Sequence, residues 1–494
     1  MASPSEIVAV LRNSFKSGKT LSLEYRIKQL KNLHRMYTEK EKEILTAMYK
    51  DLRKSKMEAV VTELDILIND IKNTLYNIRQ WHKNEYVHKD IANLLDTAYI
   101  QKDPYGVALV IGSWNYPLQL LLLPVQGAIA AGNCVLLKPS EVSQFTAKLL
   151  AEIIPQYLDP DCYRVYNGGP EETTEALKEK FDIIFYTGSS AVGKIIHSAA
   201  NKNLTPTILE LGGKSPCYID NSVNLKRAVR RIIWGKFLNV GQTCVAPDYI
   251  LCTTDVQNKF IELAKEVITE YFGKNPKESP DLGRIISDKH FQRLTALLKD
   301  GNVAVGGEYD ANEKYIAPTI LINAKINSAV LNEEIFGPIL PIVNIDDTVD
   351  AIQYINSREK PLALYIFSDN KNDVELILKN TSSGSVCVND TIMQLTVDTL
   401  PFGGVGNSGM GSYHGKFSFD AFSHKKSVLY KDLGFIGEKL SEARYPPYSP
   451  GKMAYLRFML TKRPISLSIP SNLLYFLTGV LTTYLIQAYL KHMS

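Results

Sequence analysis

One of the six cysteines in this 494-residue chain has the sequence context of a reactive thiol. Cys244 stands in NVGQTCVAPD, after a glycine and two polar residues, in a loop predicted between a helix at 223–238 and a strand at 249–254. The other cysteines lie in apolar, strand-like runs typical of inert buried thiols: Cys134, Cys162, Cys217, Cys252 and Cys387. Because no CxxC pair occurs, the pattern predicts no zinc finger, thioredoxin-like site or other metal site. Cys244 is therefore the candidate nucleophile, the alternative being an ordinary loop cysteine.

A nucleophilic cysteine needs a base, and the sequence offers a carboxylate more readily than a histidine. Only His414 among the eight histidines lies near a glycine-rich segment, so a protease-like cysteine–histidine pair is poorly supported. Glu210 lies at the end of the apolar run PTILEL and is followed by GGKSP. Sites in α/β proteins form at the carboxyl ends of parallel strands. Glu210 is therefore the candidate base, the alternative being a surface acid at a strand end.

Two glycine patterns are compatible with a nucleotide site. TGSSAVGK (187–194) follows the strand-like DIIFY, and its glycines Gly188 and Gly193 open a predicted helix whose free N–H groups suit a phosphate. A G-x-G-x-x-G match at Gly404, Gly406 and Gly409 lacks the strand–helix context that such a motif needs. We interpret 403–411 as a shaped active-site or hinge loop.

The elements that must position these residues alternate between strands and helices. Residues 5–80 have helical apolar spacing, and from about 105 short apolar strands alternate with helices. Continuously apolar strands of this kind indicate a parallel sheet covered on both faces. The predicted fold class is α/β, with two doubly wound domains, a Rossmann-like cofactor domain and a catalytic domain. Their predicted bounds are 1–82 with 104–211 for the first and 212–410 for the second.

Two further strand-like pieces, 97–103 and 425–431, belong to neither series. We expect them to pair in a small projecting β arm for oligomerisation, formed by 83–103 and 411–440. The composition is that of a globular protein, with 45% hydrophobic and 22% charged residues. A net charge of +4 is too weak to indicate nucleic acid as a partner.

The carboxyl-terminal segment differs from the rest of the chain in charge. Glu442 is the last acid, and the cations that follow it are Arg444, Lys452, Arg457, Lys462, Arg463 and Lys491. We interpret 441–470 as a basic, proline-containing linker. The uncharged stretch 471–490 has 20 residues, enough for a helix to cross about 30 Å of hydrocarbon. A membrane anchor is the prediction, with a buried core helix and an in-plane amphipathic helix as the alternatives.

Seven long motifs occur together and in order, and the resemblance that they carry covers about residues 5–430. They are IGSWNYP (111–117), LKPSE (137–141), FYTGSSAVGK (185–194), LELGGKSP (209–216), GQTC (241–244), EEIFGP (333–338) and PFGG (401–404). In these motifs the chain resembles the aldehyde dehydrogenase superfamily. The short amino-terminal arm, NYPLQLLLLP, ARYPP and the apolar tail are similar to the class 3 branch, and in particular to microsomal fatty aldehyde dehydrogenases.

The resemblance implies a role for each matching residue. Cys244 would be the nucleophile, Glu210 the base that activates water, and Asn115 the side chain that holds the oxyanion together with the Cys244 N–H. Glu334 would contact the nicotinamide ribose. Glu333 is the neighbouring candidate for this contact, but in an extended segment its side chain should face the other way. The cofactor residues implied are Lys138 and Glu141 for the adenosine ribose, Gly188, Ser189, Ser190, Ala191, Val192 and Gly193 for the pyrophosphate, and Glu334 and Phe336 for the nicotinamide ribose and ring. Tyr116 and Phe402 would line the substrate funnel.

The resemblance also implies the reaction and its setting. We expect a homodimer that oxidises medium- to long-chain aliphatic aldehydes to acids with NAD, with NADP as a possible cofactor. The alternative is a cysteine-dependent acyl hydrolase or acyltransferase without redox chemistry. Through its tail the protein would contact membrane lipid at the endoplasmic reticulum with its body in the cytosol. The cytoplasm and the lipid-droplet surface are the alternative locations.

Overall fold

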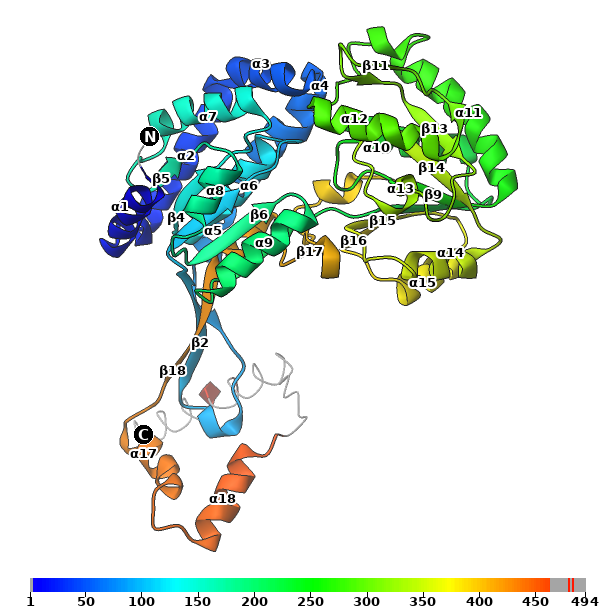
Figure 1. Ribbon diagram of the computed structural model, residues 1–494. Coiled ribbons are helices and arrows are strands. Elements are labelled where there is room, and N and C mark those ends of the chain that lie inside the picture. The colour runs from blue at the N-terminus through cyan, green and yellow to red at the C-terminus, as the bar shows by residue number, and fades with distance from the viewer. Residues whose placement is uncertain (1–2, 463–478, 480–481, 484–494) are drawn as a thin grey trace. The chain divides into compact units, whose positions relative to one another are not determined.

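The computed structural model describes residues 3–462, 479 and 482–483, and the chain forms two compact units (Figure 1). The larger unit combines the residues up to Lys83 with Lys102–Lys426. The smaller unit combines Asn84–Gln101 with the described residues from Ser427 onward.

The amino-terminal region is helical, as predicted. Each longer helix buries an apolar stripe, for example Leu30 and Leu33 in the second helix. A five-residue π-helical turn, Val60–Leu64, separates the last two helices. The helices are α1 (Pro4–Lys16), α2 (Leu23–Glu39), α3 (Glu41–Leu52), α4 (Lys56–Ala59) and α5 (Asp65–Trp81).

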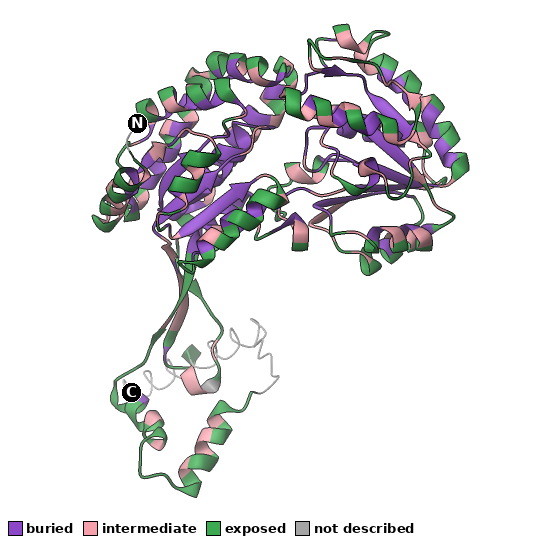
Figure 2. Cartoon of the chain, in the orientation of Figure 1, coloured by how far each residue is buried: buried purple, intermediate pink, exposed green. Residues whose placement is uncertain are grey.

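A six-stranded sheet of order β17-β7-β6-β3-β4-β5 forms the core of the first α/β domain. Its strands are parallel except β17, which runs antiparallel to β7. Every residue of β3, β4 and β6 is buried, so helices and loops cover both faces (Figure 2). The strands are β3 (Val107–Ile111), β4 (Cys134–Lys138), β5 (Tyr163–Val165), β6 (Ile183–Thr187), β7 (Thr207–Glu210) and β17 (Gly409–Met410). The helices among them are α6 (Gln119–Ala131), α7 (Gln144–Tyr157), α8 (Pro170–Ala176) and α9 (Ser190–Asn201).

The second α/β domain has a seven-stranded sheet of order β10-β13-β14-β9-β8-β15-β16. Only β10 runs antiparallel to its neighbour. The strands are β8 (Pro216–Ile219), β9 (Tyr249–Cys252), β10 (Asn302–Val305), β13 (Thr319–Ile322), β14 (Ile339–Asn344), β15 (Ala363–Phe367) and β16 (Ser385–Val388). The helices are α10 (Leu225–Phe237), α11 (Thr254–Phe272), α12 (Asp288–Leu297), α13 (Ala329–Asn332), α14 (Thr348–Asn356) and α15 (Lys371–Asn380). The α/β fold class with two such sheets is confirmed.

The sequence analysis missed four strands of this sheet, which are β10, β13, β14 and β15. Pro341 lies inside β14, and a proline within an apolar run argues against a strand. In the structure Pro341 faces Leu321 of β13 in parallel register. The neighbouring strands supply the burial that the local pattern does not reveal.

The glycine-rich loop 403–411 closes tightly on β7. A side chain at Gly404 would lie 2.1 Å from the Ser408 carbonyl oxygen, and one at Gly409 would lie 2.2 Å from that of Leu209. Gly409 has φ +146°, which disfavours other residues, and it pairs with Glu210. Gly404 and Gly409 of the G-x-G-x-x-G match thus serve close backbone packing beside Glu210.

The smaller unit contains part of a three-stranded sheet of order β1-β2-β18, with β1 (Glu85–Tyr86), β2 (Thr97–Pro104) and β18 (Ser423–Tyr430). The expected pairing of 97–103 with 425–431 is confirmed. The predicted boundary of the arm at 411 needs a correction. Helix α16 (Gly415–Ala421) packs on α5 and α6 of the larger unit. Phe419 of this helix and Phe422, which follows it, are buried there.

The segment predicted as a linker, 441–470, contains a helix. Helices α17 (Phe435–Ser441) and α18 (Pro450–Leu460) follow β18. Ser449 caps α18 by accepting a hydrogen bond from the Lys452 N–H, and Pro450 occupies its first turn, where a proline is tolerated. Among the described residues no helix is both long and apolar enough to cross a membrane. The predicted anchor, 471–490, lies outside the described residues except for three positions.

Candidate active site

A cavity of about 620 Å³ is lined by residues of both α/β domains. Asn115 reaches it from the loop between β3 and α6, Glu210 from the end of β7, and Cys244 from the loop before β9. The structure therefore brings together at one cavity the three side chains for which the sequence predicted chemistry.

Cys244 is only partly exposed, and its surroundings favour the neutral thiol. Burial, together with the carboxyl groups of Glu334 and Glu210, raises the pKa of Cys244 to about 12. Because the thiolate is the reactive form of a cysteine, positive charge brought into the cavity would make this thiol more reactive. The loop thus holds the nucleophile in a resting form.

Glu210 is 2% exposed, and neither of its carboxyl oxygens has a hydrogen-bond partner among the described residues. Burial alone raises the pKa of Glu210 well above its usual range. A carboxylate whose pKa is raised is a stronger base than an exposed one, because its pKa lies closer to the working pH. Its unpartnered oxygens are free to bind a reacting water.

The amide of Asn115 is held against the loop of the cysteine. Its Nδ2 donates a hydrogen bond to the carbonyl oxygen of Gln242 at 3.0 Å, two residues before Cys244. An amide nitrogen carries two N–H groups, so the second can donate to an oxygen of a bound substrate. This geometry suits the stabilisation of an oxyanion formed at Cys244.

A glycine turn and the start of α9 form one wall of the cavity. Gly188, Ser189 and Val192 line it, and Ser189 caps α9 by accepting from the Val192 N–H. At Gly188 a side chain would lie 2.1 Å from the Tyr186 hydroxyl, so only glycine fits. The free N–H groups at this helix start suit a phosphate.

The other residues predicted around the pyrophosphate have different surroundings. Ser190 Oγ donates to the Asn407 carbonyl at 3.1 Å, and Ala191 is exposed. Gly193 is buried against Leu211, whose Cδ2 would lie 2.7 Å from an added side chain. Ser190 and Gly193 therefore hold α9 in place beside the cavity.

Lys138 and Glu141 line the cavity at the end of β4. The ammonium of Lys138 is nearly buried and lies 3.3 Å from the Glu141 carboxylate, whose side chain is 44% exposed. Burial lowers the pKa of Lys138, although Glu141 opposes that effect. The pair offers a donor and an acceptor for sugar hydroxyls.

Glu334 and Phe336 line the cavity from the second domain. The Glu334 carboxyl packs so closely on Gly212 that an added side chain there would lie 2.0 Å from Oε2. Burial raises the pKa of Glu334 to about 8, and its Oε1 has no hydrogen-bond partner among the described residues. Glu333 also borders the cavity, but it is exposed.

Tyr116 and Phe402 are not among the residues that line this cavity. The Tyr116 hydroxyl lies 2.8 Å from Thr243 Oγ1, beside the cysteine loop. The Phe402 ring stacks on His414 with 5.1 Å between centroids. Their predicted contact with substrate remains a prediction.

Among the lining residues that the sequence analysis missed are Trp114, His290 and Arg293. The Trp114 ring contacts Phe336 and His290, with centroids 5.2 and 5.0 Å away. Arg293 donates to the backbone oxygens of Glu334 and Ile335. Trp114 stands inside IGSWNYP, which was a usable signal, whereas α12 carries no motif.

The residues present fit a nicotinamide dinucleotide. The start of α9 suits its pyrophosphate, Lys138 with Glu141 suits one ribose, and the unpartnered Oε1 of Glu334 suits hydroxyls of the other. The aromatic ring of Phe336 can pack on a flat heterocycle.

Comparisons with known proteins agree with this chemistry. The model of the aldehyde dehydrogenase family matches residues 4–428. The chain belongs to this family. Aldehyde dehydrogenase family 3 member A2 of Mus musculus is 52% identical over 453 residues, which are 92% of this chain and 93% of the mouse protein. The dimeric NADP-preferring aldehyde dehydrogenase of Rattus norvegicus is 52% identical over 92% of this chain and 99% of the rat protein.

A solved structure of Staphylococcus aureus AldH in a substrate-bound state has a TM-score of 0.90 and is 41% identical. The match covers 93% of this chain and 100% of that one. The protein is thus an aldehyde dehydrogenase, a nicotinamide-dependent oxidoreductase whose cofactor is NAD or NADP. The alternative of a cysteine hydrolase without redox chemistry is not favoured for this aldehyde dehydrogenase.

Proposed function

We propose that this aldehyde dehydrogenase oxidises medium- to long-chain aliphatic aldehydes to carboxylic acids through a covalent intermediate on Cys244. The observation that carries the proposal is the meeting of Cys244, Glu210 and Asn115 at one cavity with the dinucleotide-binding wall. The resemblance of NYPLQLLLLP, ARYPP and the apolar tail to microsomal fatty aldehyde dehydrogenases supports the substrate class.

Each of the three residues has a distinct step in the proposed reaction. The Cys244 thiolate attacks the aldehyde carbon, and the Asn115 amide with the Cys244 N–H stabilises the resulting oxyanion. One such donor contributes about 3 kcal/mol to the transition state. Bound NAD or NADP would supply the hydride acceptor, and loss of hydride from the carbon leaves a thioester on Cys244. Glu210 then takes a proton from water as it attacks the thioester, which releases the acid and the thiol.

The test is a series of linear aldehydes with the purified full-length protein and NAD, followed at 340 nm. We expect kcat/KM to rise with chain length, because each buried CH₂ contributes about 0.8 kcal/mol. A flat or falling series contradicts the substrate class. Ester hydrolysis without any aldehyde-dependent NADH would support the hydrolase alternative instead.

We further propose a homodimer formed through the arm. Strand β18 exposes Leu429 and Tyr430, and exposed apolar side chains on a small sheet favour a partner. The rat relative is named dimeric, which supports the same assembly. Light scattering of the full-length protein in detergent, compared with a Leu429→Asp variant, checks this. A monomeric mass for the unaltered protein contradicts it.

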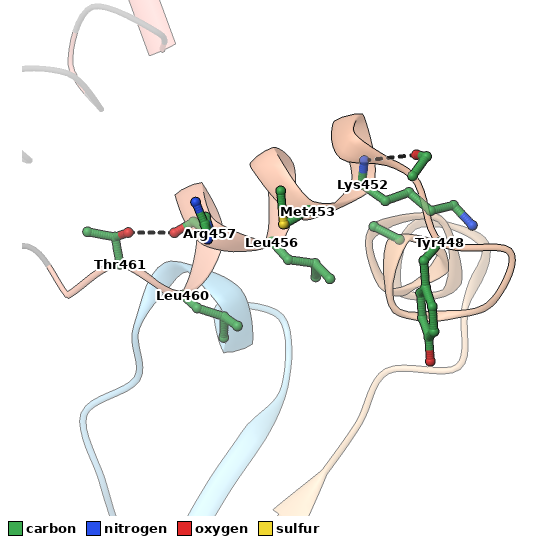
Figure 3. A pocket seen from close by; sticks show the side chains of 9 residues that line it. Tyr448, Lys452, Met453, Leu456, Arg457, Leu460 and Thr461 are labelled. Carbon is green, nitrogen blue, oxygen red and sulfur yellow. Dashed lines mark hydrogen bonds between the residues drawn. The ribbon is translucent and has the colours of Figure 1, made fainter.

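We also propose that the carboxyl-terminal segment binds membrane lipid at the endoplasmic reticulum, with the body in the cytosol. Helix α18 carries exposed Met453 and Leu460 together with the cations Lys452 and Arg457 (Figure 3). It also exposes Phe458. Because no acid follows Glu442, this apolar and basic helix suits an anionic lipid surface.

A further inference from the structure

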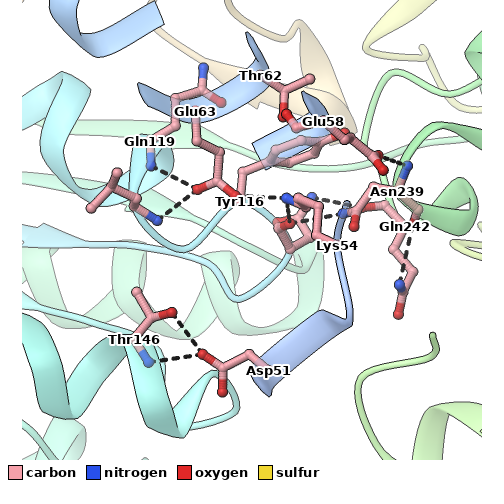
Figure 4. A network of polar contacts seen from close by, with 12 residues as sticks. Asp51, Lys54, Glu58, Thr62, Glu63, Tyr116, Gln119, Thr146, Asn239 and Gln242 are labelled. Atoms are coloured by element: carbon pink, nitrogen blue, oxygen red, sulfur yellow. Dashed lines mark hydrogen bonds and ion pairs between the residues drawn. The ribbon is translucent and has the colours of Figure 1, made fainter. Parts of the chain in front are cut away.

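A fully buried ion pair lies beside the proposed site (Figure 4). The Lys54 ammonium is 2.7 Å from the Glu63 carboxylate, and both side chains are 0% exposed. Lys54 lies between α3 and α4, and Glu63 lies in the π-helical turn Val60–Leu64. Neither residue lines the cavity, so neither is a candidate for contact with substrate or cofactor.

The Lys54 ammonium contacts three groups. Besides Glu63, it donates to the backbone oxygen of Asn115 at 3.2 Å and lies 4.1 Å from the centroid of the Tyr116 ring. An ammonium group has three N–H donors, and a cation within about 6 Å of an aromatic face is attracted to it. The lysine therefore holds two consecutive residues of the loop that carries Asn115.

Glu63 holds the far end of the same loop. Its Oε2 accepts from the N–H groups of Leu118 and Gln119, at 2.9 and 3.2 Å, where α6 begins. The N-cap residue of α6, Leu118, makes no side-chain cap of its own, so Glu63 caps this helix from another element. A carboxylate at a helix start is also favoured by the helix dipole.

The loop is tied to the cysteine from the other side. The Asn239 amide donates to the backbone oxygen of Asn115 at 2.8 Å and to that of Gln242 at 3.1 Å. The side chain of Asn115 itself donates to the Gln242 oxygen at 3.0 Å. Asn115 is thus clamped between the buried pair and the loop that ends in Cys244.

Stability alone does not account for a buried pair of this kind. A well-packed apolar pair of similar volume is often as stable or more stable, because desolvating two charges is costly. The π-helical turn that carries Glu63 is another costly local feature, and such turns often occur near functional sites. Both features are explained if the ion pair holds a residue of the site in the position that the reaction needs.

We propose that Lys54 and Glu63 form a positioning pair that fixes the Asn115 amide where the oxyanion develops. The inference rests on the proposed oxyanion role of Asn115. Displacing a catalytic donor by about 1 Å can cost about 100-fold in rate. Loss of the pair should therefore slow acylation of Cys244 about 10- to 100-fold and leave binding of the dinucleotide unchanged.

The test variant is Lys54→Met/Glu63→Gln. The glutamine retains an acceptor for the N–H groups of Leu118 and Gln119, and the methionine fills the volume of the lysine without its charge. The readout is the burst of nitrophenolate from p-nitrophenyl acetate, which acylates Cys244 without any cofactor. Dinucleotide affinity is measured separately by calorimetry.

A double-mutant cycle with Asn115→Ala separates positioning from general damage. In the unaltered background we expect the pair variant to slow the burst about tenfold or more. In the Asn115→Ala background it should change the burst less than about twofold, because the donor that it positions is already gone. Equal losses in both backgrounds overturn the proposal.

Arg26→Met is the matched control. Arg26 is a buried cation that donates to the Ala130 oxygen at 3.3 Å, near the opposite end of α6. We expect it to lower the melting temperature and leave the burst within twofold of the unaltered protein. A burst lowered as much as in the pair variant overturns the proposal.

Two further outcomes distinguish this inference from the proposed function. If Asn115→Ala leaves the burst unchanged, the oxyanion role itself fails, and the positioning role fails with it. If Asn115→Ala slows the burst but the pair variant does not, only the positioning role is wrong. Should the pair variant not fold, Lys54→Gln replaces it. The glutamine side chain is one atom shorter than that of lysine, so its nitrogen should not reach both Glu63 and Asn115. The same cycle then applies.

Discussion

Burial favours the neutral forms of the side chains that are proposed to react. The pKa values of Cys244, Glu210 and Glu334 all lie above their ordinary values, and burial is the first cause for each. Nearby carboxyl groups raise the pKa of the thiol further. A positive charge brought into the cavity, such as an oxidised nicotinamide, would favour the thiolate through Coulomb attraction. The reactivity of the Cys244 thiol would therefore depend on whether the oxidised cofactor is bound.

Alkylation of Cys244 should show this resting state directly. Because the pKa of Cys244 is raised to about 12, the thiolate fraction in the free enzyme rises about tenfold per pH unit throughout the range from 7 to 10. The rate of iodoacetamide labelling at Cys244, followed by peptide mass spectrometry, should rise in parallel. Added NAD should increase the rate at pH 7. A plateau below pH 8 without NAD contradicts the prediction.

Glu210→Gln should affect deacylation more than acylation. The glutamine keeps the shape of the side chain but cannot accept a proton from water. We expect steady-state turnover to fall about 100-fold or more, while the first turnover of NADH in a stopped-flow experiment falls much less. Cys244→Ala serves as the control, and it should form no NADH in the first turnover. An equal fall in both rates would place Glu210 at an earlier step, such as thiol ionisation.

At the scale of elements, the site depends on where strands end and helices begin. Strands β3, β6 and β7 are parallel neighbours, so their carboxyl ends lie at one edge of the sheet. The loops after β3 and β6, and the end of β7 itself, supply Asn115, Gly188 and Glu210. The region of α3 to α5 supports the first of these through buried polar side chains.

Glu141, between β4 and α7, should influence the choice of cofactor. Its carboxylate would repel a 2′-phosphate, so Glu141→Gln should raise kcat/KM for NADP relative to that for NAD about tenfold. Lys138 keeps its backbone partner, the Pro139 oxygen, in this variant. Initial rates with both cofactors check the ratio, and Glu152→Gln on the exposed face of α7 is the control. An unchanged ratio means that Glu141 does not face the 2′ position.

Glu58 on α4 should make stability depend on pH. Burial raises the pKa of Glu58 from its usual 4.5 to about 7, so between these values the folded state binds more protons than the unfolded state. Stability contributed by this group is therefore present below pH 4.5 and lost as pH rises through 7, by about 3 kcal/mol. Glu58→Gln should raise the melting temperature at pH 8.5 and leave it nearly unchanged at pH 5. An equal effect at both values contradicts the shift.

At the scale of the whole molecule, the chain combines an enzyme body with a smaller unit that exposes apolar surface. The body contains both sheets and the complete candidate site. The smaller unit exposes large apolar side chains such as Leu433, Phe435 and Tyr448. Activity on soluble substrates and association with lipid should therefore be separable.

Two truncations test that separation. Removal of the residues after Thr461 retains α18, and removal of the residues after Ser449 deletes it as well. We expect both forms to oxidise short aldehydes within about twofold of the full-length rate. The form that lacks α18 should lose activity on long aldehydes held in vesicles, and the form that retains α18 should keep part of it, because each CH₂ in water costs about 0.8 kcal/mol. Vesicle flotation measures binding, and full-length protein that stays unbound contradicts the lipid proposal.

Much of the architecture follows from local pattern. The mainly apolar runs at 107–111, 134–138 and 183–187 are strands covered on both faces, and helices alternate with them as predicted. Local chemistry also singled out Cys244 and Glu210, because a polar loop and a strand end expose their side chains to a site. Such signals need no knowledge of distant partners.

Tertiary structure alone decided which distant residues complete the site. Arg293 and His290 reach the cavity from α12, and Gly212 accommodates Glu334 only because two segments far apart in sequence pack closely. The burial that raises the pKa values, and the pair of Lys54 and Glu63 behind Asn115, likewise depend on long-range packing. Local sequence determines which conformation a segment prefers, whereas the dielectric environment and partners of a side chain exist only once the segments are assembled.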